Sequence, residues 1–249
     1  MSDPPPAFLT TERLGLHPPT RADAAFVHRT SLDERVWRTG FTPFPRSREA
    51  VAEFLAEGAN GDDRVDFLVR VRDGDPGDGF TDAAATHAAD TVDEVASDDG
   101  RDGVVSDDGT DGAASSDDDA DGAAAAESAD RTDDGPHPDP AGRRAGMVSL
   151  TDVDYRRSSA EVGYWLAPAA QGHGYATAAV ERVLTYAFDT LDLHRIEAEV
   201  DAPNDASVGL LESLGFTHEG TRREVRVLDG ERVDMHVYGL LAPEWDDGD

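Results

Sequence analysis

The segment Tyr164–Ala176 reads YWLAPAAQGHGYA, and the residues after it have the periodicity of an amphipathic helix. Its glycines, Gly172 and Gly174, allow backbone N–H groups to turn toward a ligand where that helix begins. The N–H groups of a first helical turn lack partners within the helix, and the helix dipole places positive charge there, so an anion is favoured. The helix is predicted from apolar residues at helical spacing: Ala179, Val180, Val183, Leu184, Ala187, Phe188 and Leu191.

Two interpretations of this glycine loop stay open on its own residues. In the first, the loop cradles a phosphate group of a ligand. In the second, the glycines only permit a tight turn between a strand and a helix, because short glycine motifs often match by chance. The rest of the chain has to decide between them.

The composition is strongly acidic and excludes several kinds of chemistry. The 249 residues carry a formal net charge of -31, contain no cysteine, and include only arginine among their 22 Lys and Arg positions. A disulfide framework, a thiolate metal site, a cysteine nucleophile and a lysine Schiff base are therefore excluded, and no metal is expected. Such an acidic surface stays hydrated and screened in concentrated salt, where the Debye length is about 3 Å at 1 M. This balance predicts a halophile protein.

The same charge argues against several partners. Binding to nucleic acid requires a basic stripe on the protein, which this chain lacks. No apolar run approaches the ~18 residues of a membrane-spanning helix, and the start, Met1–Pro6, lacks the basic and apolar regions of a signal peptide. We therefore expect a cytoplasmic monomer or homodimer with no nucleic-acid or membrane partner.

The composition changes at about Asp73 and recovers at about Gly146. Residues 73–145 contain 22 Asp and Glu residues and four Arg residues. Too few apolar side chains are present to offset the entropy of ordering, so a disordered insertion is predicted. It serves either as a solvated spacer or as an acidic arm for a basic partner. The flanks then form a single domain over 9–242, with flexible tails at 1–8 and 243–249.

The flanks have a mixed α/β pattern. Strands are predicted over 13–17, 65–71, 146–150, 160–166, 195–200, 219–227 and 232–241, and helices after Thr20, over 48–59, over 175–191 and after Asn204 or Asp205. The strands 65–71 and 146–150 are expected to pair as a hairpin around the insertion, because doubling the length of a surface loop costs only about 0.6 kcal/mol.

Five motifs follow one another along the chain: Glu161-Val162-Gly163-Tyr164-Trp165-Leu166, Gln171-x-x-Gly174-x-Ala176, His194-Arg195-Ile196-Glu197, Asn204-x-x-Ser207 and Leu214-Gly215-Phe216-x-x-Glu219-Gly220. This order is similar to the GNAT superfamily of acetyl-CoA-dependent N-acetyltransferases. More narrowly it resembles the Rim-type subgroup, which acetylates the N-termini of ribosomal proteins. The resemblance extends from about Leu9 to Leu241 apart from the acidic tract. It implies an α/β GNAT fold, with a mostly antiparallel sheet of about seven strands and about four helices, splayed around the acetyl-CoA site.

The resemblance also implies which residues bind the co-substrate acetyl-CoA. The coenzyme A pyrophosphate would be held by Gln171, Gly172, His173, Gly174, Tyr175 and Ala176. The backbone of Tyr164, Trp165 and Leu166 would meet the pantetheine arm and supply an oxyanion donor. Asn204 would offer its amide to the pantetheine, or serve only as a helix cap. His173 is alternatively an exposed loop histidine.

The catalytic assignments are more open. Glu161 is the first candidate for the general base, against a structural ion pair, with Glu219 and Glu224 as runners-up. Ser207 would protonate or stabilise the departing thiolate, against a role as a cap partner. The Rim subgroup has a glutamate where this chain has Arg226, so that base does not transfer directly.

The acceptor is predicted to enter a groove of the first two helices around Val36, Trp37, Phe41 and Phe44, unless these side chains belong to the core. Asp234 and Tyr238 border the acceptor pocket or belong to the core and surface. The sequence thus predicts acetyl transfer from acetyl-CoA to a primary amine, such as a protein N-terminal α-amine, by direct attack in a ternary complex. The alternatives are a small-molecule amine as acceptor, or a non-catalytic coenzyme A-binding protein that uses the acidic tract for a partner.

Overall fold

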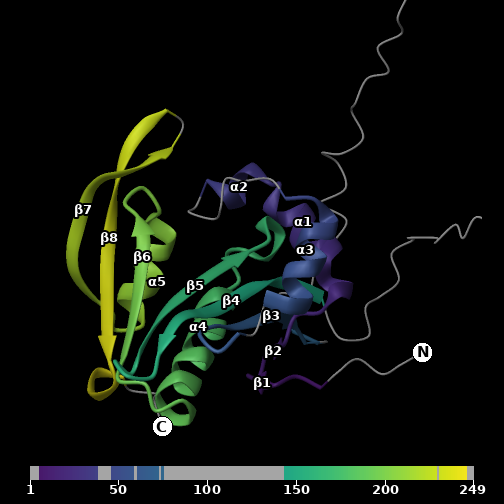
Figure 1. Cartoon of the computed structure of the whole chain (residues 1–249), viewed down its shortest axis with the longest axis horizontal. Helices are drawn as coiled ribbons and strands as arrows, with labels where there is room; N and C mark the ends of the chain where they lie inside the picture. The colour runs from purple at the N-terminus through teal and green to yellow at the C-terminus, as the bar shows by residue number, and fades with distance from the viewer. Residues whose placement is uncertain are drawn as a thin grey trace, which may run out of the picture. The chain divides into compact units, whose positions relative to one another are not determined.

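A computed structural model describes residues 6–38, 46–58, 61–72, 74–75, 143–228 and 230–245. These residues belong to one compact unit formed by Met1–His87 and Pro138–Asp249. Its strands make one eight-stranded sheet in the order β1-β2-β3-β4-β5-β6-β8-β7 (Figure 1). They are β1 (Leu9–Thr10), β2 (Leu14–His17), β3 (Val65–Val71), β4 (Arg143–Asp154), β5 (Ser159–Leu166), β6 (Arg195–Asp201), β7 (Thr217–Leu228) and β8 (Glu231–Leu241).

The described α-helices are α1 (Ala24–Ser31), α2 (Glu34–Trp37), α3 (Arg48–Glu53), α4 (Tyr175–Thr185) and α5 (Asp205–Ser213). The helices predicted over 48–59 and 175–191 are shorter than expected as α-helices, because each continues as a turn of π-helix, over Phe54–Gly58 and Tyr186–Thr190. None of the described helices is long and apolar enough to cross a membrane.

The mixed α/β fold predicted from the sequence is confirmed, with a few additions. β1 was not predicted, since two residues carry no periodicity. All neighbouring strands pair antiparallel except β5 and β6, which are parallel. Asn204 caps α5 by accepting a hydrogen bond from the Ser207 N–H, and Gly215 ends this helix with φ +87°, as the sequence indicates.

Helices cover both faces of the sheet. On one face, α4 and α5 pack on alternate strand residues such as Val162, Ile196 and Ala198 in the larger apolar core. On the other face, α1 and α3 pack on Leu68, Met147 and Trp165 in a smaller core. Because side chains of a strand alternate between faces, β5 contributes to both cores. We call these the α4/α5 face and the α1/α3 face.

The predicted hairpin around the acidic tract is present. β3 and β4 pair antiparallel, from Val65 opposite Leu150 to Val71 opposite Arg143. The strand β4 begins three residues before the predicted start at 146, inside the range 73–145. Its first residues are charged, which hid them from the hydrophobic pattern, and Arg144 Nε donates to the buried Asp23 Oδ1 at 2.9 Å. This ion pair holds the start of β4 in the sheet.

Candidate active site

A fork between β5 and β6 forms the centre of the site. The two parallel strands pair only at Ser159–Glu161, which lie opposite Arg195–Glu197. Beyond this point β5 continues alongside β4 to Leu166, whereas β6 continues alongside β8 to Asp201. The strands therefore separate toward their carboxyl ends, as Figure 1 shows. An opening of this kind connects the two faces of the sheet.

A cleft of about 380 Å³ lies on the α4/α5 face of the fork. It is lined by the end of β5, the glycine loop and α5. Most residues predicted to bind the coenzyme line it: Tyr164, Trp165, Leu166, Gln171, Gly172, Gly174, Tyr175, Ala176 and Asn204, together with Ser207. His173 is the exception, since its ring stacks on Tyr175 with centroids 5.4 Å apart and it is not among the lining residues.

The glycine loop has the geometry of an anion site. Gly172 and Gly174 have φ values of +79° and +75°, which residues other than glycine rarely adopt. Gly174 is the N-cap of α4 and no side chain makes a capping hydrogen bond there, so the first N–H groups of this helix are not used by a capping side chain. The Gln171 amide donates to the Leu166 carbonyl at 3.2 Å, which ties the loop to the end of β5.

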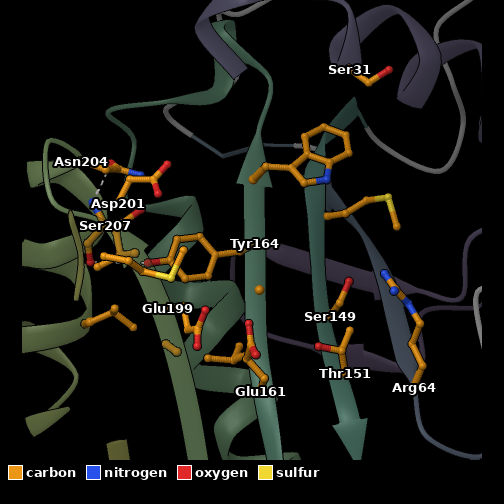
Figure 2. Close-up of a pocket in the computed structure, with 18 of the residues that line it drawn as sticks. Ser31, Arg64, Ser149, Thr151, Glu161, Tyr164, Glu199, Asp201, Asn204 and Ser207 are labelled. Carbon is orange, nitrogen blue, oxygen red and sulfur yellow. Dashed lines mark hydrogen bonds between the residues drawn. The ribbon is translucent and has the colours of Figure 1, made fainter. Parts of the chain in front are cut away.

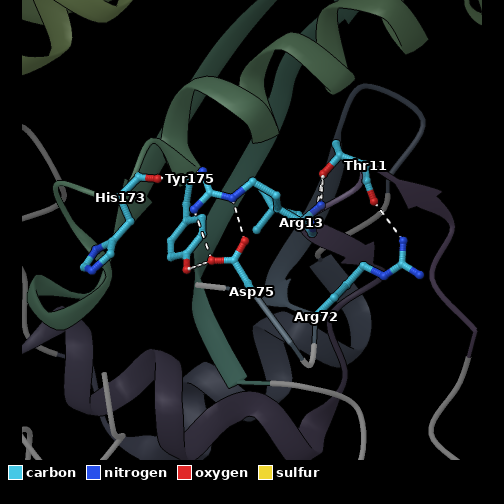
Figure 3. A network of polar contacts seen from close by, with 7 residues as sticks. Thr11, Arg13, Arg72, Asp75, His173 and Tyr175 are labelled. Carbon is cyan, nitrogen blue, oxygen red and sulfur yellow. Dashed lines mark hydrogen bonds and ion pairs between the residues drawn. The ribbon is translucent and has the colours of Figure 1, made fainter. Parts of the chain in front are cut away.

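A network of polar contacts ties this loop to residues near β2 and β3 (Figure 3). The Tyr175 ring is fully buried, and its hydroxyl donates to Asp75 Oδ1 at 2.8 Å. Arg13 binds the same carboxylate through Nε at 2.6 Å and Nη2 at 3.1 Å, and its Nη1 donates to the His173 carbonyl at 2.9 Å. Burial, aided by the Asp75 carboxylate, raises the pKa of Tyr175. The residues Arg13 and Asp75 were not predicted to take part in the site.

A second cavity, of about 390 Å³, opens on the α1/α3 face of the fork. Its floor is made by β4, β5 and β6, and its walls include Val27, Val51 and Phe54 of the helical layer. Gly163 lies in the floor, and a methyl group added there would contact nothing within 4 Å. We call this second cavity the acceptor cavity. The cleft on the α4/α5 face is called the coenzyme cleft. Both are lined by Tyr164, Trp165, Asn204 and Ser207, so they meet at the fork.

Glu161 lies in the acceptor cavity close to the apex of the fork (Figure 2). Among the described residues it makes no hydrogen bond and no ion pair, so the structural ion pair considered from the sequence is not found there. Burial raises the pKa of its carboxyl group, and the nearby carboxylates of Glu199, Asp152 and Glu197 raise it further. A half-buried carboxylate with a raised pKa is suited to accept a proton near neutral pH.

Hydroxyl groups gather where the two cavities meet. The Tyr164 hydroxyl lies 3.5 Å from the Ser207 carbonyl, and burial raises the pKa of this phenol. The phenol therefore stays protonated at neutral pH. Asn204 Oδ1 accepts the Ser207 N–H at 3.2 Å, so the capping role considered for Asn204 is present. Ser207 and Tyr164 are both able to donate a proton at this junction.

The alternative bases lie outside both cavities. Glu219 accepts hydrogen bonds from Arg195, which lowers the pKa of its carboxyl group. Glu224 is exposed, and its N–H donates to Asp234 Oδ1 at 2.9 Å. Tyr238 is buried and donates to Glu212 at 3.3 Å. None of these residues lines either cavity, whereas Arg226 lines the acceptor cavity and contacts Asp201.

The helical groove predicted for the acceptor is only partly described. Val36 is buried and belongs to the smaller core, which agrees with the core interpretation of this residue. Phe41 and Phe44 lie outside the described residues. Instead, the helical side of the acceptor cavity is lined by Val27, Ser31, Arg46, Val51 and Phe54, which the sequence did not indicate. Within the described part of the chain, no cluster of three or more His, Cys, Asp or Glu side chains is arranged to hold a metal ion.

Comparison with known proteins finds acetyltransferases similar to part of this chain. Residues 112–217 match the model of the acetyltransferase (GNAT) domain. The chain is 37% identical over 105 residues to a putative ribosomal N-acetyltransferase, YdaF, of Bacillus subtilis, covering 42% of this chain and 57% of that protein. It is 37% identical over 100 residues to the spermidine N(1)-acetyltransferase of Vibrio cholerae, covering 40% and 58%. The matched part is thus a little over half the length of these relatives.

The solved structures agree on the fold. The crystal structure of spermidine N-acetyltransferase from Vibrio cholerae in complex with CoA and spermine superposes with a TM-score of 0.63 at 19% sequence identity. The superposition covers 94% of this chain and 98% of that one. At this identity the likeness establishes the GNAT fold.

Proposed function

We propose that this chain is a member of the GNAT acetyltransferase family and transfers the acetyl group of acetyl-CoA to a primary amine. The observation that carries the proposal is the pair of cavities on opposite faces of the sheet, which meet at the fork between β5 and β6. A thioester in one cavity and an amine in the other would come together at this junction. Such placement converts a bimolecular reaction into one within a single complex.

The coenzyme cleft fits the pyrophosphate and pantetheine of acetyl-CoA. The uncapped N-terminus of α4 and the left-handed glycines Gly172 and Gly174 would hold the pyrophosphate through backbone N–H groups. Gln171 carries no charge because its side chain is a neutral amide, and this amide donates to the Leu166 carbonyl. His173 lies beside the loop and remains a candidate donor. Tyr164, Trp165 and Leu166 would border the pantetheine, with Asn204 opposite them on α5.

Three groups would carry the chemistry at the junction. A backbone N–H between Tyr164 and Leu166 would stabilise the oxyanion that forms when the amine attacks. Glu161 would accept the proton of the amine, directly or through one water. Ser207 would donate to the departing thiolate, with the Tyr164 phenol beside it as a second proton donor. An α-amine has a pKa near 8, so a base of modest strength is sufficient.

Two classes of acceptor are represented among the relatives. The similarity to the putative ribosomal acetyltransferase supports a Rim-type role on a protein N-terminus. The similarity to spermidine acetyltransferases supports a small amine. In either class the amine would lie over Gly163, where the floor has no side chain.

The acidic balance supports activity in concentrated salt. A net charge of -31 is self-repelling in dilute buffer and is screened when the Debye length is short. We propose that the chain is a halophile's cytoplasmic enzyme and that the acidic tract is an insertion between β3 and β4. Assays belong in high potassium chloride for this reason.

The experiment that tests the function is an acetylation assay. The protein is incubated in high potassium chloride with acetyl-CoA and a panel of amines and peptides, and release of the free thiol and acetylated products are measured by absorbance and mass spectrometry. A Gly174→Trp variant, whose side chain would block the loop, is the control. Thiol release that depends on an amine and is lost in this variant supports the proposal. Equal labelling by both proteins would refute it, and thermal stabilisation by acetyl-CoA without any turnover would favour a non-catalytic coenzyme-binding protein.

A further inference from the structure

Six charged side chains line the acceptor cavity, and four of them belong to ion pairs. The pairs are Asp201–Arg226, Glu199–Arg222 and Arg64–Asp66. In each pair the carboxylate offsets the guanidinium, so these groups leave little charge for a ligand to neutralise. Glu161 and Arg46 are the two charged lining residues that form no ion pair with any described residue. The cavity therefore offers a ligand one carboxylate and one guanidinium.

Arg46 lies on the helical side of the cavity, directly before Ser47, the N-cap of α3. It is exposed, and its Cζ lies over the Phe54 ring at 5.5 Å from the centroid. Arg64 Cζ lies 5.2 Å from the same centroid. Stacking on an aromatic ring orients a guanidinium and leaves its N–H groups available. The Arg46 guanidinium is therefore positioned to bind a carboxylate through two parallel hydrogen bonds.

The guanidinium groups and the Glu161 carboxylate lie on different sides of the cavity. In the register of the sheet, Thr151 of β4 lies opposite Glu161 of β5, and Arg64 directly precedes β3 at the level of Thr151. Two strand spacings, or roughly 10 Å, therefore separate Arg64 from Glu161. Figure 2 shows Glu161, Thr151 and Arg64 in this order across the cavity. Because Arg46 shares the Phe54 ring with Arg64, it belongs to the side away from Glu161.

We propose that Arg46 forms an anion subsite of the acceptor cavity, so that the preferred acceptor is a peptide N-terminus with Asp or Glu as its second or third residue. This inference rests on the proposed acetyltransferase function and names the charge of its substrate. The α-amine would lie over Gly163 beside Glu161, and the acidic side chain would bind Arg46. An extended peptide spans about 3.5 Å per residue, so its second and third residues reach roughly 3.5 to 7 Å from the amine before their side chains extend further.

Other amines match the two charges less well. A free α-amino acid has its carboxylate only about 3 Å from its amine, which is too short to contact Glu161 and Arg46 together. A linear polyamine would direct a second cation toward Arg46, and like charges repel. A neutral peptide would leave Arg46 without a carboxylate. An acidic residue near the N-terminus supplies the missing charge at the required separation.

The test uses the full chain at the lowest potassium chloride concentration that keeps it folded by circular dichroism, because salt screens an exposed ion pair. Thiol release from acetyl-CoA is measured with the peptide amides Ser-Glu-Glu-Ala-Tyr, Ser-Gln-Gln-Ala-Tyr and Ser-Lys-Lys-Ala-Tyr, and with 6-aminohexanoate. We expect kcat/KM for the acidic peptide to exceed that for the glutamine peptide about fivefold. The difference should lie mostly in KM, because the contact is remote from the reacting amine.

Variants of one exposed position assign this preference. In Arg46→Gln the ratio of acidic to glutamine peptide is expected to fall to about 1. In Arg46→Glu the preference should reverse, with the lysine peptide used best. The matched control is Arg48→Gln, since Arg48 is also exposed, is two residues away and does not line the cavity. Its ratio is expected to equal that of the wild type.

Other outcomes overturn the proposal. Equal kcat/KM for the acidic and glutamine peptides in the wild type would show that no anion subsite acts. A preference that persists in Arg46→Gln would show that the acidic residue binds elsewhere. Faster use of 6-aminohexanoate than of any peptide would refute the peptide assignment. Each of these results leaves acetyl transfer intact, whereas the proposed function itself fails if no amine releases thiol.

Discussion

Replacement of Tyr175 by phenylalanine removes one atom from the network beneath the glycine loop. The lost hydroxyl donates to Asp75 at 2.8 Å in a buried position. Arg13 keeps its two hydrogen bonds to the same carboxylate, so Asp75 is not left without donors. The substitution therefore tests the hydroxyl that links the start of α4 to the segment that follows β3.

The expected loss follows from the charge on the acceptor. A hydrogen bond to a charged group contributes about 1.5 to 3 kcal/mol. Because Arg13 still pairs with the carboxylate, we expect the lower end, about 1.5 kcal/mol. For a protein of this size 1 kcal/mol corresponds to roughly 2 to 4 °C in melting temperature, so Tyr175→Phe is expected to melt about 3 to 6 °C below the wild type.

The same bond positions the proposed pyrophosphate loop. Arg13 links the Asp75 carboxylate to the His173 carbonyl, so a looser carboxylate loosens the loop. If about half of the lost free energy appears in binding, the Kd for coenzyme A rises roughly threefold, since about 1.4 kcal/mol corresponds to a factor of ten. Melting is followed by circular dichroism, and coenzyme A binding by calorimetry, at fixed salt.

Tyr155→Phe is the matched control, because Tyr155 is 62% exposed and loses no buried bond. It should melt and bind as the wild type does. The reasoning is refuted if Tyr175→Phe melts within about 1 °C of this control. A lower melting temperature with unchanged affinity would instead limit the network to a structural role.

Three further results are expected. Burial raises the pKa of Glu161 above its unfolded value, so ionisation of this carboxyl group destabilises the fold as pH rises through the folded pKa. Glu161→Gln should therefore have a higher melting temperature than the wild type at pH 8 and the same melting temperature at pH 4. Its kcat should fall by about 10² or more. A Cβ at Gly146 would lie 2.1 Å from the Trp165 carbonyl, so Gly146→Ala should lower the free energy of unfolding by about 3 kcal/mol in denaturant titrations, whereas Gly163→Ala, with open space around it, should not. Replacing residues 77–141 by a short Gly-Ser turn should preserve circular dichroism and coenzyme A binding, and an unfolded product would contradict the insertion hypothesis.

The parts of the fold that were predicted correctly depend on sequence patterns within a single segment of the chain. Val65–Val71 alternates over seven residues, and the structure has this strand with the predicted bounds. Gly215 was predicted as a left-handed cap because a leucine-rich helix precedes it, and it has φ +87°. By contrast, the first residues of β4 are Arg143 and Arg144, and Arg144 pairs with Asp23, 121 residues away. No local pattern contains that information.

The residues of the site also divide into those that a local sequence pattern indicates and those that it does not. The glycine loop could be located because its geometry depends on Gly172, Gly174 and the helix that follows. Arg13 and Asp75 could not, since they are 160 and 100 residues from the loop positions that they contact. Asp75 also lies within the tract that composition assigns to the insertion, although its side chain is buried. Composition averages over a window and does not detect one buried contact.

Arg226 departs from the Rim-type pattern, and it lies in the acceptor cavity beside the buried carboxylate of Asp201. The Rim-type pattern that the sequence resembles has a glutamate there, and an arginine alone would repel an ammonium acceptor. In this chain Arg226 faces Asp201, so the cation is offset by a buried carboxylate on β6. A buried carboxylate without the arginine would be strongly unfavourable. Each residue therefore accounts for the other.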